Sequence, residues 1–158
     1  MTFVAGPYTS TLAASALGIT ENGFELTHRD EADIIRGDNL GQTDQDWVYR
    51  GGQTLLNTVL QEYDAAGALA AFWPYHATFG RHGQAGVLGS SVAAALVLTA
   101  VAGTTASAAP ATLTITLAAL DPGFDWRMLF AARLRNVPLR MKALPNNNAG
   151  VITWFTST

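Results

Sequence analysis

A polar, acidic connector between two strand-like runs constrains the fold of this chain more than any other feature of the sequence. The connector spans Gly37 to Asp46 and is followed at once by the run Trp47-Val-Tyr-Arg-Gly-Gly52. A connector of this length inside a compact domain is uncommon unless it is functional or disordered. It carries no metal-ligand or nucleophile pattern, so its composition favours contact with another molecule. The chain is therefore expected to be a subunit of an assembly rather than an enzyme.

The remaining sequence is typical of a mainly β domain with many short strands. Alternating and β-branched runs bounded by turn residues predict strands at residues 24–28, 33–36, 47–50, 92–103, 111–117, 128–143 and 151–156. Turns are expected at residues 18–23, 121–125 and 145–150, with a short acidic turn before residue 33 and a glycine-punctuated loop at 76–91. This pattern predicts a mainly-β sandwich or barrel in a single domain of 158 residues.

One short helix interrupts this pattern. Asp64 can cap it, alanines dominate its interior through Trp73, and Pro74 stops it. Residues 53–63 fit either a strand or a helical face. Residues 1–17 are rich in Ala, Ser and Thr without firm periodicity, and fit an extended N-terminal arm.

The composition is poor in charge, with 49% apolar and 13% charged residues. The charged fraction is roughly half the usual share. A well-buried monomer with alanine-rich packing is one interpretation of these values. The other is that neighbouring subunits cover part of the exterior.

The charges that remain are unevenly distributed along the chain. Residues 1–64 hold ten carboxylates against three arginines, whereas residues 65–158 hold two carboxylates against five arginines and Lys142, giving net charges of −7 and +4. These charges either neutralise each other within one molecule or form opposed faces suited to head-to-tail association. The sequence leaves both possibilities open.

No motif for catalysis, a cofactor or a metal is present. The chain has no cysteine, and His76 and His82 lack a third ligand beside them. The glycines from Gly80 to Gly89 lack the spacing and the lysine of a phosphate-binding loop. Arg133 and Arg135 alternate onto one strand face, where a subunit contact is favoured over nucleic-acid binding because no aromatic residues interleave and the chain is acidic.

Two further absences bear on location. The uncharged stretch between Arg81 and Asp121 is broken by small residues and a strand pattern, so two buried strands fit better than a membrane span. The first residues carry no basic and apolar regions of a secretory signal. The chain is thus expected to fold in a cytoplasm.

Several segments, taken in order, resemble the major tail tube proteins of tailed bacteriophages. They are Gly6-Pro-Tyr-Thr-Ser-Thr11, Leu17-Gly-Ile-Thr-Glu-Asn-Gly-Phe24, Ile35-Arg-Gly-Asp-Asn39, Thr43 to Gly52, Val59-Leu-Gln-Glu-Tyr63, Pro110-Ala-Thr-Leu-Thr114 and Trp154-Phe-Thr-Ser-Thr158. The resemblance spans nearly the whole chain. Its motifs are structural rather than catalytic, and their order carries the likeness.

The resemblance implies an antiparallel β-sandwich with one flanking helix, here residues 64–73. Six copies would form a ring whose inner strands make a shared β-barrel, and stacked rings would form the virion tail tube through which DNA passes without sequence-specific binding. The partners implied are other copies of the chain and the tape-measure, tail terminator and baseplate or adaptor proteins, with no membrane. The loop at residues 37–46 would reach the next ring, after assembly in the host cytoplasm.

The charge distribution suggests which residues meet between rings. The residues expected at this contact are Asp38, Asn39, Asp44 and Asp46 on one subunit and Arg127, Arg133, Arg135 and Lys142 on another. Other interpretations remain open. They are a related ring protein such as a tail terminator, baseplate adaptor or secretion tube, and an independent carbohydrate- or receptor-binding sandwich.

Overall fold

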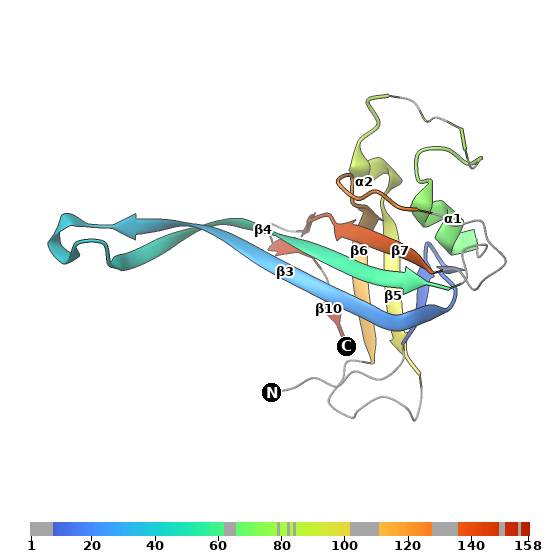
Figure 1. Ribbon diagram of the computed structural model, residues 1–158, viewed down its shortest axis with the longest axis horizontal. Coiled ribbons are helices and arrows are strands. Elements are labelled where there is room, and N and C mark those ends of the chain that lie inside the picture. Colours follow the sequence, from blue (N-terminus) through green and yellow to red (C-terminus); the bar gives the residue numbers. More distant parts are fainter. Residues whose placement is uncertain are drawn as a thin grey trace.

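The computed structural model describes residues 8–61, 66–78, 80–81, 83, 85–101, 111–127, 136–148, 151–154 and 156–158. Most of them belong to one antiparallel sheet of eight strands in the order β2-β1-β5-β6-β7-β4-β3, with β10 pairing with β6 (Figure 1). The expectation of a mainly β, antiparallel fold with few helices is confirmed.

The elements have the following bounds. The strands of the large sheet are β1 (Tyr8–Leu12), β2 (Ser15–Ala16), β3 (Thr20–Arg36), β4 (Asp44–Leu60), β5 (Ala94–Ala100), β6 (Thr112–Leu120), β7 (Val137–Ala143) and β10 (Thr156–Ser157). A separate two-stranded sheet pairs β8 (Asn146–Asn148) with β9 (Val151–Thr153). The helices are α1 (Ala66–Phe72), the single turn α2 (Gly89–Val92) and the 3₁₀ turn η1 (Asp38–Leu40).

One face of the sheet forms the core, and α1 packs against it. Because successive side chains of a strand point to opposite faces, every second residue of the inner part of β4 and of β7 is buried. Leu56, Leu60 and Met141 meet Phe72 of α1 in a single cluster, and all four are at most 2% exposed. Burying each such side chain stabilises the fold by about 1.5–3 kcal/mol.

Gly67 allows α1 to approach the N-terminal strands closely. A Cβ atom at this position would lie 2.5 Å from the backbone oxygen of Ala16 and 2.6 Å from that of Ser15. A residue with a side chain would therefore push the helix away from β2. The short helix is fixed to the sheet by this backbone contact as well as by its buried alanines and Phe72.

The strands β3 and β4 form a hairpin that extends far beyond the rest of the sheet (Figure 1). Each has 17 residues, and they pair from Thr20 with Leu60 out to Arg36 with Asp44. The neighbour β7 reaches only the inner part of β4, Thr54–Leu60. Among the described residues, the ten residues Asp44–Gln53 therefore pair with β3 alone, over a length of about 30 Å.

Several sequence-based expectations for β3 and β4 were wrong. Residues 20–23 of the turn expected at 18–23 lie inside β3 as an irregularity, with Gly23 at φ +76° and a register shift between Thr20 and Phe24, whereas residues 18–19 precede the strand. The acidic turn before residue 33 is also strand, because residues 29–32 pair with β4. For residues 53–63, where the sequence fits either a strand or a helix, the structure shows a strand as far as Leu60. The connector is shorter than expected, since β4 already begins at Asp44.

Other expectations need smaller corrections. The helix expected at 64–73 is present as α1, and residues 62–65, including Asp64, lie outside the described residues. Residues 8–12 of the expected arm pair with β5, and thus belong to the sheet. The strand expected at 92–103 is present as the shorter β5, because Val92 belongs to α2 and residues 102–103 lie outside the described residues. The strand expected at 111–117 is present as β6. The last expected strand, 151–156, is divided between β9 and β10, which lie in different sheets.

Candidate assembly surface

The outer part of the hairpin, residues 31–50, is exposed to solvent on both faces. We call it the outer hairpin. It comprises the ends of β3 and β4 and the connecting loop with η1. Almost every residue in it whose side chain is described is exposed, the exception being the half-exposed Gly37. A two-stranded ribbon without a third partner is marginally stable in water, so this geometry favours a contact with another molecule.

One face of the outer hairpin is apolar. Ile34 pairs with Trp47 and Ala32 pairs with Tyr49, and because residues two apart share a face, these four side chains lie together. Trp47, Tyr49 and Ile34 are 69%, 56% and 53% exposed. The opposite face carries the smaller exposed apolar side chains Ile35 and Val48, together with charged residues.

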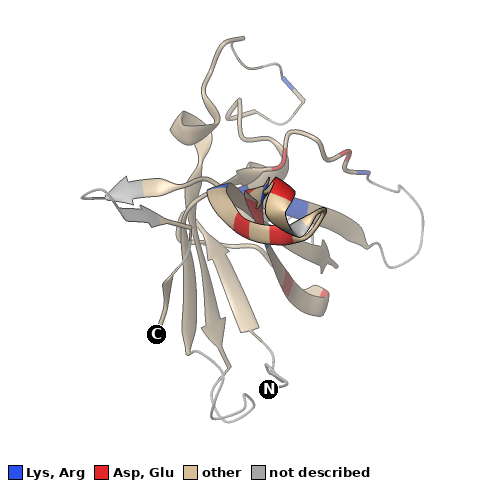
Figure 2. Ribbon diagram, turned by 90° about the vertical axis from the view of Figure 1, so that its left-hand side faces the viewer, with Lys and Arg blue, Asp and Glu red and all other residues tan. Residues whose placement is uncertain are grey.

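Some charged side chains of the outer hairpin form ion pairs with each other. Nε of Arg36 donates to Oδ1 of Asp44 over 2.6 Å, and the Arg50 guanidinium pairs with Asp33. All four groups are more than half exposed, so each pair contributes about 0–1 kcal/mol. Figure 2 looks along the hairpin and shows acidic residues gathered on it. Among the described residues, Asp38 and Asp46 form no ion pair.

The residues expected at the contact between rings lie in different elements of the structure. Asp38, Asn39, Asp44 and Asp46 lie in the outer hairpin, as one group. Arg127 is exposed and follows the turn after β6, and the half-buried Lys142 lies in β7 between Leu55 and Ala119. Arg133 and Arg135 lie outside the described residues. Within one subunit, Asp44 meets Arg36 rather than any of the expected bases.

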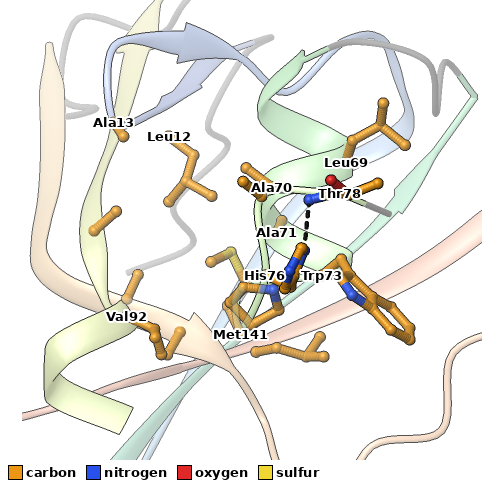
Figure 3. Close-up of a pocket in the computed structure, with 16 residues that line it drawn as sticks. Leu12, Ala13, Leu69, Ala70, Ala71, Trp73, His76, Thr78, Val92 and Met141 are labelled. Carbon is orange, nitrogen blue, oxygen red and sulfur yellow. Dashed lines mark hydrogen bonds between the residues drawn. The ribbon is translucent and has the colours of Figure 1, made fainter. Parts of the chain in front are cut away.

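A second notable surface lies at the α1 end of the molecule, and no sequence pattern predicts it. A hollow of about 720 Å³ lies between α1, the segment after it and strands β1, β5 and β6. Figure 3 shows Leu12, Leu69, Val92 and Met141 around it, with the Nδ1 atom of His76 accepting a hydrogen bond from the backbone N–H of Thr78 over 2.8 Å. Its lining is mostly aliphatic, with few polar groups that could fix a small polar ligand.

Next to this hollow, an aromatic group joins α1 to the segment after β6. The rings of Phe72 and Trp126 lie 5.3 Å apart, and Trp73 meets Trp126 edge-on at 6.4 Å. The indole N–H of Trp73 donates to the backbone oxygen of Arg81 over 2.6 Å. A smaller hollow of about 350 Å³ is lined by these aromatic side chains and by Tyr75 and Arg81.

The root of the hairpin contains a Thr-His-Asp series that sequence reasoning missed. His28 lies with Nδ1 2.7 Å from the Thr54 hydroxyl and Nε2 2.9 Å from Asp30 Oδ1. This order resembles that of a nucleophile, a base and an orienting acid. The Thr54 side chain is completely buried, however, so a substrate has no access to the hydroxyl. The His28–Thr54 hydrogen bond joins β3 to β4 at the base of the outer hairpin, and Asp30 contacts the same ring from within β3.

The other groups considered for chemistry are far apart or outside the described residues. His76 lies at the hollow, and its possible co-ligand His82 is outside the described residues. Within the described part of the chain, three or more His, Cys, Asp or Glu side chains nowhere gather as a metal ion would require. None of the helices described there has the length and apolar character needed to cross a bilayer.

Comparison of the chain with protein-family models and with curated protein sequences gives no match.

Proposed function

We propose that this chain is the structural subunit of a bacteriophage tail tube, which polymerises as stacked hexameric rings into the conduit for DNA delivery. The outer hairpin carries this proposal. It extends beyond the sheet, it is covered by no other part of the described chain, and it exposes Ile34, Trp47 and Tyr49 on one face. Such a surface is expected of a subunit whose neighbours complete its packing.

The edges of the large sheet support ring formation. β3 is an edge strand of 17 residues, and the opposite edge is the two-residue strand β2. A long edge with unpaired backbone groups invites pairing with another chain, and closing a ring removes that liability. In this proposal, strands of six copies form the shared inner barrel, and each copy contributes a β-sandwich with α1 on its flank.

The charge of the chain is compatible with a lumen through which DNA moves. Tight binding of DNA requires many contacts from lysine and arginine to phosphates. The chain has nine basic residues and a net charge of −3, so it is not suited to hold DNA along its length. The proposed partners are other copies of the chain and the tape-measure, terminator and baseplate or adaptor proteins of a virion tail.

Electron microscopy of the purified protein over a range of concentrations tests this function. We expect rings and stacked tubes, with contacts between neighbouring subunits of about 2,000 Å² or more, as in obligate interfaces. A protein that stays monomeric at every concentration contradicts the proposal. Binding of a glycan by such a monomer would favour the carbohydrate-binding interpretation instead.

A further inference from the structure

We infer that the surface receiving the outer hairpin is the α1 end of a second copy, where the apolar face with Trp47 enters the hollows on either side of Trp73 and Pro74. This inference rests on the proposed function, because it names the partner surface used in assembly. Three observations carry it.

The exposed apolar side chains concentrate at two ends of the molecule. Of the nine large exposed hydrophobic residues in the described part, five lie in the outer hairpin, and Tyr75, Val87 and Leu88 lie in the segment between α1 and α2. Figure 1 shows the hairpin projecting from one end and the two helices at the other. Two different surfaces at opposite ends produce a head-to-tail contact, which generates rings or filaments.

The α1 end is hollowed and the hairpin protrudes. The hollows of about 720 and 350 Å³ both include Trp73 and Pro74 in their lining, so they adjoin. Their walls are mainly aliphatic and aromatic. Aromatic side chains that fill apolar pockets contribute much of the energy of protein interfaces. Trp47 and Tyr49 are the aromatic residues that the outer hairpin offers.

The charges of the two surfaces are complementary. Residues 29–50 hold six carboxylates and three arginines. Two of those arginines pair with Asp33 and Asp44 of the hairpin itself, and Asp30 meets His28, so among the described residues Glu31, Asp38 and Asp46 form no ion pair and can meet an external partner. At the α1 end, Arg81 lines the smaller hollow and Arg127 follows its lining residue Trp126. Among the described residues neither arginine forms an ion pair, although Asp125 lies two residues before Arg127. Complementary charge favours this orientation of two copies.

Disulfide trapping tests the contact cleanly, because the chain has no cysteine of its own. Ala32→Cys places a thiol on the apolar face of the hairpin, and Ala77→Cys places one at the larger hollow. The control is Ala95→Cys, an exposed alanine in β5 that does not line either hollow. Each variant is purified alone under reducing conditions, and pairs are mixed, assembled and then oxidised.

We expect the mixture of Ala32→Cys with Ala77→Cys to yield about tenfold more cross-linked heterodimer than the mixture with Ala95→Cys, because the contact raises the local thiol concentration. Filling the larger hollow with Ala70→Trp, an exposed position on α1, should abolish assembly while the circular dichroism of the subunit is unchanged. Tubes that form without excess cross-linking at residue 77 would overturn the inference and leave the proposed function intact. Absence of any oligomer in the parent protein would overturn both.

Discussion

The inner and outer parts of the β3–β4 hairpin have the same secondary structure and opposite environments. In the inner part, β4 lies between β3 and β7, and Leu56 and Leu60 are at most 1% exposed. In the outer part, the same two strands pair with no third strand of the described chain, and Trp47 is 69% exposed. Backbone pairing alone therefore does not distinguish a structural strand from a contact surface. A third strand and a covering helix distinguish them, because they bury the inner part and are absent from the outer part of the described hairpin.

This comparison predicts that the outer hairpin can be removed without unfolding the rest of the subunit. Glu31 pairs with Gly51, so replacing residues 32–50 by Asn-Gly, a dipeptide suited to two-residue turns, should give a shortened hairpin. We expect folded monomers with a melting temperature close to that of the parent, and complete loss of tubes in electron micrographs. Tubes of normal length from the shortened chain would show that the outer hairpin is not required for assembly.

A second variant tests whether assembly requires the apolar side chains of the outer hairpin or only a hairpin of full length. Replacing Ile34, Trp47 and Tyr49 by threonine keeps residues suited to strands and removes the large side chains. Loss of assembly in this full-length variant would assign the contact to the apolar face. Retained assembly would assign it to the backbone edge or to the charges.

Single truncations at the two parts of β4 should have opposite consequences. Leu56→Ala leaves a cavity in the core and should lower the free energy of unfolding by about 2–5 kcal/mol. Trp47→Ala should change the stability of the isolated subunit by no more than about 0.5 kcal/mol, because the side chain is exposed, and should impair assembly. Chemical denaturation at concentrations below assembly measures both. A large destabilisation by Trp47→Ala would mean that the outer hairpin packs on its own subunit.

The close contact of α1 with β2 offers a smaller and equally specific test. Gly67→Ala should lower the free energy of unfolding by about 1–3 kcal/mol, because the added Cβ meets backbone oxygens that cannot rotate away. Gly123→Ala is the matched control, since a Cβ atom there has nothing within 4 Å. Equal melting temperatures for the two variants would contradict the packing of α1 described above.

The sequence predicted much of the structure outside the outer hairpin, because buried and exposed residues alternate along the strands there. The alternation around residues 111–117 predicted a strand, and the alanine-rich run before Pro74 predicted the helix. It failed between the strands expected at 24–28 and 33–36, where Arg29 to Ala32 continue β3 without a core to impose a hydrophobic pattern. The hollow at the α1 end was missed for another reason. Its walls come from elements far apart in the chain, and no local pattern records their meeting.

The apolar face of the outer hairpin was within reach of sequence reasoning. Trp47 and Tyr49 alternate with Val48 next to an acidic connector, which places two aromatic side chains on one face of a strand. The partner Ile34 follows only once the register of the hairpin is known. The acidic connector predicts a contact through the loop, and the structure adds large exposed apolar side chains in the strands that flank it.

The smallest expected effects concern the charges of the outer hairpin, and they divide into two kinds. Asp44→Asn removes the pair with Arg36 within one subunit, so it should change stability by about 0–1 kcal/mol and assembly very little. Asp38→Lys and Asp46→Lys together reverse two charges of the outer hairpin that have no ion-pair partner in the described part of the chain. In an assembly that joins them to Arg81 or Arg127 of another copy, like charges would then meet, and assembly should slow. Light scattering at rising salt distinguishes the cases, because exposed charges are screened over about 8 Å at physiological ionic strength. The parent protein should assemble more slowly as salt rises, and the double variant should show the opposite trend. An identical salt dependence for both proteins would mean that the apolar face acts without electrostatic guidance.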